Sequence, residues 1–355
     1  IFDQIHLLQY ADIRCCYVAE SNLQIITKNK KAVDPGLKNI FPLTSFAERK
    51  LGIALSLERK KATHYKNRRQ RPGTTYVFTN LGKKGPEGPA NTSGYLGTTL
   101  EGQVTLNAGI QMWQVPYTGT YIIESRGAAG ANGSYDLRNK LGDKHVTKRH
   151  HGGVGAKISG TFWLTHGTLL KILVGQRGMM HTLTINLQTL DLILDVGGGG
   201  GGSFVTYVNN IPLVIAAGGG GGGGNGVGFG TDTFDADSGQ LGVLGSRCNS
   251  TVGNGGMLCS NEEKYTINAG SGAGLLSNGR SPNLAHHAMC FVDGGRGGTN
   301  IGFDGDGGFG GGGYGALNGG GGGGYSGGGV WANSTYGIAG GGGSVNHGFD
   351  KQSGY

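Results

Sequence analysis

Uninterrupted runs of glycine constrain this chain more than any other feature of its sequence. Glycine loses more conformational freedom on folding than any other residue, so a glycine run becomes ordered only if neighbouring groups satisfy its backbone hydrogen bonds. The runs begin at the ends of apolar segments and are separated by aromatic residues, which a flexible linker does not require. The six runs are residues 197–202, 218–224, 310–313, 319–324, 327–329 and 340–343. We therefore expect the runs to be ordered, with flexible linkers as the alternative.

An ordered glycine run can form an extended helix with about three residues per turn and no internal hydrogen bonds. Each N–H and C=O must then bond to an adjacent helix, and that helix can approach closely only where no Cβ intervenes. Such hydrogen bonds contribute about 1 kcal/mol each, so many of them are needed to offset the entropy of ordering glycine. The runs therefore predict a bundle of polyglycine II helices rather than a hydrophobic core.

The residues before and between the first runs have the pattern of short β-strands. Apolar and β-branched segments near 110–115, 121–123, 156–162 and 169–174 are bounded by glycine or proline. Residues 203–208 and 211–215 flank Asn209-Asn210 and predict a hairpin, because asparagine tolerates the positive φ of such a turn. Several short strands without long helices between them favour a mainly β fold, an antiparallel sandwich or barrel.

The first 75 residues differ in composition from the rest of the chain. They hold 14 Lys/Arg and 6 Asp/Glu, a net charge of +8, whereas the remaining residues hold 16 of each. The basic peak at 59–71 is typical of a heparin, nucleic-acid or nuclear-import patch, or of a solvated linker. Tyr65 is its one aromatic residue, so we expect no nucleic-acid partner, and heparin remains a candidate. We interpret residues 1–75 as an irregular, unassigned segment that is divergent, disordered or an error of gene prediction.

The chain contains no motif for catalysis, and we expect it not to be an enzyme. P-loop, kinase and metal-binding motifs are absent from the sequence, so no cofactor or metal is expected. Cys248, Cys259 and Cys290 leave an odd cysteine in the glycine-rich part, where Cys248 and Cys259 are the disulfide candidates. Four sequons are candidates for N-glycosylation if the chain is secreted: Asn91, Asn132, Asn249 and Asn333.

Four sequence blocks occur in a fixed order among the strands and glycine runs. They are Gly-Pro-Glu-Gly-Pro at 85–89, Trp-Gln-Val-Pro at 113–116, Leu-Val-Gly-Gln at 173–176 and Ile-Ala-Ala-Gly at 215–218. With the runs, these blocks make residues 76–347 resemble the glycine-rich extracellular region of the anaplastic lymphoma kinase and leukocyte tyrosine kinase receptors. The resemblance implies a sandwich like that of tumour necrosis factor, carrying an inserted bundle of polyglycine helices. Residues 348–355 would then be a C-terminal tail.

The resemblance also implies a function in signalling at the cell surface. The family's region binds small basic cytokines, and binding promotes receptor dimerisation and activates an intracellular kinase. The acidic residues that match this role are Asp232, Asp235 and Asp237, which in a structural interpretation form a polar loop capping the bundle. The chain begins at Ile1 and shows neither a signal peptide nor a membrane span. We therefore expect a fragment of a longer single-pass glycoprotein on the extracellular side of the plasma membrane, with a structural or adhesive glycine-rich protein as the alternative.

Overall fold

The computed structural model is mainly β, and helical structure in its described residues is confined to 3-10 turns such as η3 (Ser93–Tyr95) and η5 (Phe291–Asp293). The chain divides into two compact units, Ile1–Gln9 with Thr75–Tyr355 and, separately, Tyr10–Thr74. All that follows concerns the first unit. The described residues are 4–10, 73–139, 145–186, 188, 190–223, 235–260, 267–282, 286–299, 305–332 and 337–355.

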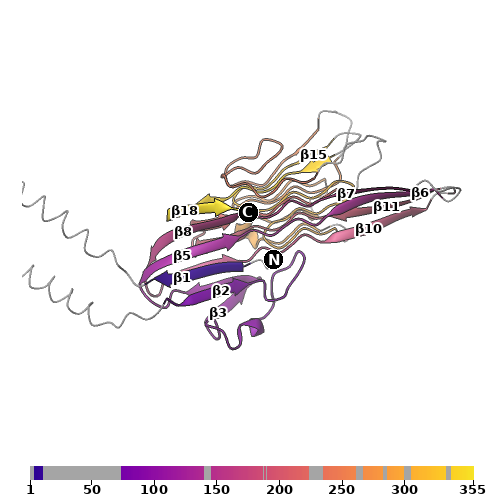
Figure 1. Ribbon diagram of the computed structural model, residues 1–355. Coiled ribbons are helices and arrows are strands. Elements are labelled where there is room, and N and C mark those ends of the chain that lie inside the picture. The colour runs from indigo at the N-terminus through magenta and orange to yellow at the C-terminus, as the bar shows by residue number, and fades with distance from the viewer. Residues whose placement is uncertain are drawn as a thin grey trace, which may run out of the picture. The chain divides into compact units, whose positions relative to one another are not determined.

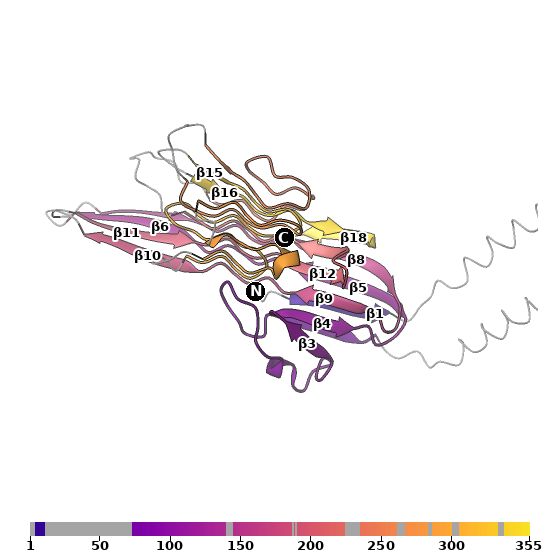
Figure 2. The same ribbon diagram turned by 180° about the vertical axis from the view of Figure 1, so that it is seen from behind.

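Two antiparallel sheets pack against one another at one end of this unit (Figures 1 and 2). The five-stranded sheet has the order β18 (Phe349–Gly354), β8 (Lys157–Leu164), β5 (Gly119–Arg126), β1 (Gln4–Tyr10) and β2 (Thr75–Thr79). The six-stranded sheet has the order β17 (Val345–Asn346), β13 (Pro212–Ala216), β12 (Ser203–Tyr207), β9 (Leu169–Leu173), β4 (Ile110–Gln114) and β3 (Val104–Asn107). The strands expected from alternation, including the hairpin through Asn210 at φ 65°, are therefore confirmed.

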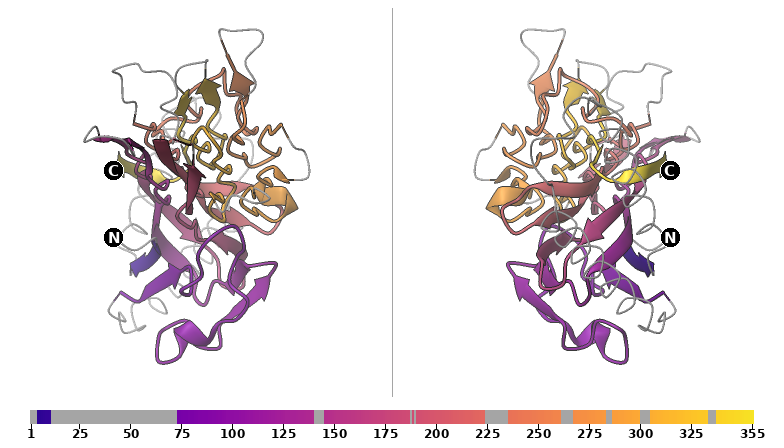
Figure 3. Two further views of the ribbon diagram at one scale, coloured as in Figure 1. Left: turned by 90° about the vertical axis from the view of Figure 1, so that its right-hand side faces the viewer. Right: turned by 90° about the vertical axis from the view of Figure 1, so that its left-hand side faces the viewer.

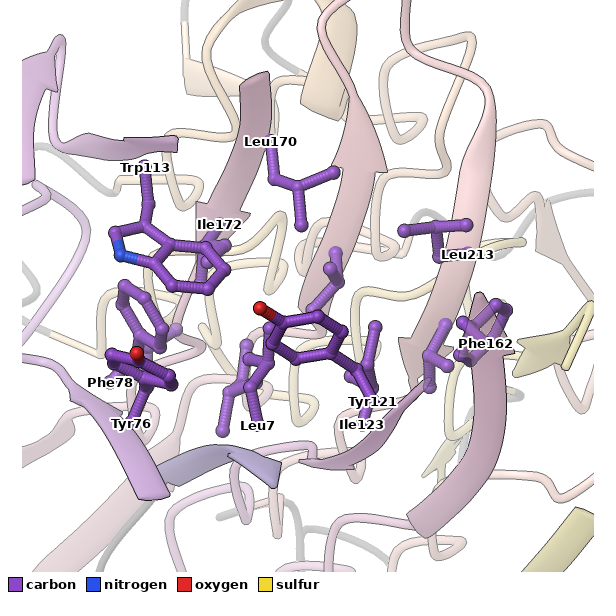
Figure 4. Packing of buried hydrophobic residues seen from close by; sticks show 14 of the residues in the cluster. Leu7, Tyr76, Phe78, Trp113, Tyr121, Ile123, Phe162, Leu170, Ile172 and Leu213 are labelled. Atoms are coloured by element: carbon purple, nitrogen blue, oxygen red, sulfur yellow. The ribbon is translucent and has the colours of Figure 1, made fainter. Parts of the chain in front are cut away.

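A hydrophobic core fills the space between these two sheets. Buried side chains alternate along β5, so one face of the strand points into the core and the other points outward. Trp113 of β4 is fully buried, and its ring centroid lies 4.9 Å from that of Tyr76 and 5.6 Å from that of Phe78 (Figure 4). Tyr121 meets the same indole edge-on at 6.4 Å. Aromatic groups from both sheets thus meet at one tryptophan in the core.

Two segments outside the expected domain boundaries add strands to the five-stranded sheet. Strand β1 pairs with β2, Ile5 opposite Phe78, and Ile5 and Leu7 are fully buried in the core. The interpretation of the first 75 residues as irregular is therefore wrong for residues 4–10, because alternate apolar residues there complete the sheet. Strand β18 pairs with β8 at the sheet's other edge, so the expected C-terminal tail also contributes a strand.

Most described glycines of the runs lie in segments that run side by side without being strands (Figure 1; Figure 3 views them along their length). Gly197 is the last residue of β11, and Gly310 and Gly311 lie in a turn with positive φ. In the run 197–202, consecutive N–H groups donate to three different neighbours in rotation. Gly197 and Gly200 bond to the run 218–222, Gly198 and Gly201 to residues 176–179, and Gly199 and Gly202 to residues 310–313. The run 218–222 rotates through three neighbours in the same way. Residues three apart thus face the same neighbour, and the expectation of ordered rather than flexible runs is confirmed.

Close backbone contacts explain why these positions are glycine. A Cβ built on Gly201 would overlap the carbonyl oxygen of Phe309, and one built on Gly200 would overlap that of Ala128. The same conflict with a neighbouring carbonyl recurs at most buried glycines of the runs. Any larger residue would force the segments apart and break the hydrogen bonds between them. We call this array of hydrogen-bonded glycine segments the glycine lattice.

The lattice connects the two packed sheets to two further sheets that the sequence patterns do not predict. The four-stranded sheet has the order β10 (Met180–Asn186), β11 (Leu190–Gly197), β6 (Gly133–Asn139) and β7 (His145–His150). The three-stranded sheet has the order β14 (Leu258–Cys259), β15 (Val330–Ala332) and β16 (Gly337–Ala339). Phe204 of β12 stacks on Phe291 at 4.8 Å between ring centroids, which anchors the lattice loops to the six-stranded sheet.

Candidate ligand-binding site

The acidic segment proposed to meet a ligand is clamped between two other segments of the lattice. Asp232 lies outside the described residues, whereas Asp235 and Asp237 are described. The N–H of Ala236 donates to the carbonyl of His151 at 2.9 Å, and that of Asp237 donates to the carbonyl of Ala339 at 2.9 Å. The backbone of the segment is therefore fixed from both sides, so its two carboxylates have defined positions.

The two carboxylates have different environments, although they are only two residues apart. The Oδ1 of Asp235 accepts a hydrogen bond from the N–H of His151 at 2.7 Å, and the residue remains exposed. Asp237 is partly buried and accepts two hydrogen bonds from Arg247, at 2.7 Å from Nε and 2.8 Å from the terminal nitrogen. The hydroxyl of Ser246 donates a third at 2.7 Å. Asp235 therefore offers a charge at the surface, whereas Asp237 is satisfied within the protein.

The Asp237–Arg247 pair is a bidentate contact, the geometry in which arginine binds carboxylate most strongly. Its hydrogen bonds raise the pKa of Arg247 above the ordinary value. Because the charges of the pair cancel, Asp237 can engage a cation of a ligand only by sharing or releasing Arg247. The acidic segment therefore has a paired arginine beside it, a neighbour that the sequence pattern does not predict.

A left-handed turn and a disulfide hold Arg247 in place. Arg247, Cys248 and Asn249 have φ values of 66°, 54° and 52°, which residues with a side chain seldom adopt. Such conformations persist only where surrounding contacts fix them. Cys248 is joined to Cys259 by a disulfide, with a Cα–Cα distance of 5.6 Å. Cys259 lies in β14, which pairs in parallel with β15, so the disulfide ties the turn to the three-stranded sheet.

A pocket of about 850 Å³ opens beside this turn. The ion pair forms one part of its lining, and Trp331, Ile338 and Tyr355 form an apolar and aromatic part. Tyr355 is 68% exposed and Trp331 is partly exposed, so both rings are accessible from outside. An aromatic surface beside a fixed ion pair is suited to hold a side chain of another protein, since tyrosine, tryptophan and arginine dominate binding hot spots.

Sequence reasoning missed Arg247, Trp331 and Tyr355 as members of one site. Trp331 is one of the aromatic residues that separate the glycine runs, and nothing in the sequence places it near Asp237. Arg247 stands next to Cys248, one of the disulfide candidates, which is the one local signal that could have singled it out. The pairing itself depends on the left-handed turn, which the residue types do not predict.

Three of the four sequons can be placed, and Asn333 lies outside the described residues. Asn91, Asn132 and Asn249 are all exposed. The side-chain oxygen of Asn132 accepts a hydrogen bond from the N–H of Gly152, which holds this asparagine against the lattice. Asn249 follows the disulfide-bonded Cys248, which lines the pocket. Glycosylation of these residues stays a prediction.

The remaining expectations concern metals, membranes and the basic run. Within the described ranges, no cluster of three or more His, Cys, Asp or Glu side chains is arranged to hold a metal ion. No helix in the described part of the chain is long and apolar enough to cross a bilayer. The basic run at 59–71 lies outside the described residues, so the heparin expectation stays untested.

Comparison with known proteins gives a partial relation. No known family profile matches the chain. The chain is 35% identical over 111 residues to the leukocyte tyrosine kinase receptor of Mus musculus. The matched stretch covers 29% of this chain and 11% of that receptor, so the chain spans a small part of its relative's length. The similarity is distant and partial, and it gives no more than a family-level hint toward this receptor.

Proposed function

We propose that this chain is part of the extracellular region of a receptor similar to leukocyte tyrosine kinase receptor, and that it binds a protein ligand there. The observation that carries the proposal is the 35% identity to that receptor. The Cys248–Cys259 disulfide supports the extracellular placement, because disulfides persist in oxidising compartments. Catalysis would belong to a kinase elsewhere in the parent protein, which would span the membrane once.

We interpret the architecture as a sandwich of the tumour necrosis factor type with an inserted bundle of polyglycine II helices. The core between the five- and six-stranded sheets supports the first part of this interpretation. The rotation of hydrogen bonds through three neighbours supports the second, because a polyglycine II helix has three residues per turn. Such a lattice gives the binding loops a rigid support without a large hydrophobic core.

We place the ligand contact at the pocket beside the disulfide. Asp235 supplies a surface charge, and the pocket supplies aromatic rings beside the Asp237–Arg247 pair. A small basic protein, the ligand class that the resemblance implies, would bring cations to Asp235 and to the faces of Trp331 and Tyr355. Binding of this kind would bring two receptors together and start signalling.

Binding of purified small basic secreted proteins to the immobilised chain, measured by interferometry, tests this proposal. Tyr355→Ala is expected to weaken binding at least about tenfold, which is about 1.4 kcal/mol, because Tyr355 lines the pocket. Phe349→Ala is the matched control, since Phe349 is an equally accessible ring (75% exposed) and does not line the pocket. Equal loss in both variants would reject the pocket, and a folded chain that binds none of these proteins would reject the ligand class.

A structural or adhesive role is the second candidate, and the glycine lattice is the observation that favours it. Such a role requires ordered glycine segments but no fixed ion pair beside an aromatic pocket. The sequence that follows Tyr355 in the full gene separates the two candidates. A cysteine-rich module, an apolar span of about 20 residues and a kinase would support the receptor, whereas further glycine repeats would support the structural protein.

A further inference from the structure

The four-stranded sheet has two very different edges. Strands β10 and β7 border it, and Figures 1 and 2 show β10 along the outer side of the sheet, beyond β11. Strand β7 carries Lys148 and Arg149, and lysine or arginine on an edge strand discourages pairing with another chain. Strand β10 has no lysine, arginine, acidic residue or proline, and all seven of its residues pair with β11 without a bulge. Among the described residues, strand β10 itself therefore carries none of the charged residues, prolines or bulges that usually discourage strand pairing.

A row of apolar side chains crosses the sheet and ends at this same edge. Tyr135 of β6 lies opposite Leu194 of β11, and Leu194 lies opposite Leu183 of β10. Tyr135 and Leu194 are buried, whereas Leu183 at the end of the row is only partly buried. At the opposite end, the residue across from Tyr135 is Lys148. The apolar row is thus closed by a cation at β7 and left open at β10.

The sequence of β10 is suited to pairing with itself. Leu183 is the central residue of the seven, and threonine stands on each side of it at Thr182 and Thr184. In an antiparallel pair centred on Leu183, the two leucines would face each other on the apolar face, and each Thr182 would face a Thr184. Threonine–threonine pairs across strands are favourable, and β10 brings no like charges into register.

We propose that two copies of this chain associate by antiparallel pairing of their β10 strands about a two-fold axis at Leu183. The two four-stranded sheets then form one continuous eight-stranded sheet, and the apolar row runs unbroken from Tyr135 of one copy to Tyr135 of the other. Each edge strand directs the N–H and C=O groups of alternate residues away from its own sheet, and these groups form the new hydrogen bonds.

The charges of the two edges favour pairing through β10 over pairing through β7, the other edge of this sheet. If β10 of one copy paired with β7 of another, Leu183 at the end of the apolar row would lie beside a strand that carries Lys148 and Arg149. This pairing would also remove those two cations from water, which is costly. It would also join unlike edges, which builds open-ended filaments rather than a closed dimer. The self-pairing joins two edges that carry neither lysine nor arginine, and it closes after two copies.

This contact deepens the proposed function, because it supplies a receptor–receptor surface for the dimerisation that the proposal includes. It requires no ligand, so it is tested on the full chain alone, and its failure leaves the ligand-binding proposal standing. A failure of ligand binding at the pocket leaves the strand pairing standing in the same way.

Oxidative cross-linking of single-cysteine additions tests the register. Leu183→Cys places the two new thiols opposite one another across the axis, so mild oxidation is expected to give a covalent dimer. Asn186→Cys is the matched control on the same strand, because its two thiols would lie about 20 Å apart at about 3.4 Å per residue. The unsubstituted chain sets the background from its native cysteines. Equal cross-linking at both positions, or none at Leu183→Cys, would overturn the proposed pairing.

Sedimentation over a range of concentrations tests the association without cross-linking. The unsubstituted chain is expected to dimerise reversibly, and Thr184→Lys to raise the dimer's Kd at least tenfold by placing two lysines in the paired edge. Thr147→Lys on β7 is the control, since Thr147 is also exposed and introduces the same charge on the guarded edge. Circular dichroism establishes that both variants remain folded. A chain that is monomeric throughout, or equal weakening by the two substitutions, would contradict the proposal.

Discussion

Alanine in place of Gly200 is expected to destabilise the glycine lattice although it adds only one carbon atom. Gly200 is buried in the first run, where its N–H donates to the carbonyl of Gly219 at 2.8 Å. A Cβ at this position would overlap the carbonyl oxygen of Ala128, so the segment carrying Ala128 must move away. A surface loop would absorb this shift, but the segment at Ala128 is itself bonded to other parts of the lattice.

The magnitude follows from the hydrogen bonds that the shift would break. Ala128 accepts from the N–H of Gly219 and donates to the carbonyl of Gly201, both at 3.0 Å. Each lost bond costs about 0.5–1.5 kcal/mol, and overpacking costs about 1–3 kcal/mol. Alanine recovers about 0.4–1 kcal/mol, because it reduces the entropy of the unfolded chain. The free energy of unfolding is therefore expected to fall by about 1–6 kcal/mol.

Gly242→Ala provides the matched control for this measurement. Nothing lies within 4 Å of a Cβ built on Gly242, and its φ is not in the left-handed region. The same substitution there is expected to leave stability unchanged or to raise it by up to about 1 kcal/mol. Urea denaturation of both variants, followed by tryptophan fluorescence, gives the comparison. If Gly200→Ala unfolds at the same urea concentration as Gly242→Ala, the close packing of the lattice is refuted.

Three further measurements test other parts of the structure. Replacing Cys248 and Cys259 together by serine is expected to lower the free energy of unfolding by about 2–3 kcal/mol, since their disulfide closes an 11-residue loop; unchanged thermal unfolding would contradict this. Burial raises the pKa of Glu124, but the hydrogen bonds from Arg126 and Lys157 have the larger combined effect and lower this pKa below 4.5. The resulting stability is present above pH 4.5 and lost as pH falls through the folded pKa, so Glu124→Gln should destabilise the protein at neutral pH and not in acid; an equal effect at both pH values would contradict it. Burial raises the pKa of Cys290 to about 11, so a thiol reagent should modify it at neutral pH only after denaturation, as mass spectrometry can show; rapid labelling of the folded chain would contradict this.

Local patterns were sufficient to predict the strands that form the main core. Strand β5 and the hairpin of β12 and β13 follow from alternating or β-branched residues bounded by turn residues, which is information carried within a few positions. Strand β1 was missed, although Ile5 and Leu7 alternate as a strand requires, because the basic composition of the first 75 residues outweighed a pattern of only seven. The four-stranded sheet was not predicted. Its strands β6 and β7 overlap a charged stretch at 138–149, and β10 and β11 lie between glycine-rich segments, so their apolar patterns are short and interrupted.

The candidate site was only partly predictable, since its members come from distant parts of the chain. The residues around 232–237 were recognisable as an acidic cluster, but the partner of Asp237 was not, because a left-handed turn at Arg247 aims that side chain. Trp331 and Tyr355 reach the same pocket through the pairing of strands and the packing of the lattice. Neither the strand pairing nor the lattice packing can be predicted from the spacing of these residues in the sequence.

The sequence by itself determined that the glycine runs cannot be held together by side chains, because they have none. Only backbone hydrogen bonds can therefore order the glycine runs. Only the tertiary structure decided which segments are neighbours, with Gly197 and Gly200 bonded to one run and Gly199 and Gly202 to another. The physical reason is that glycines have no side chains by which one run could be distinguished from another, so the runs alone do not specify their partners. The strands at the ends of the runs differ in their side chains, and the packing of these strands fixes which runs are neighbours.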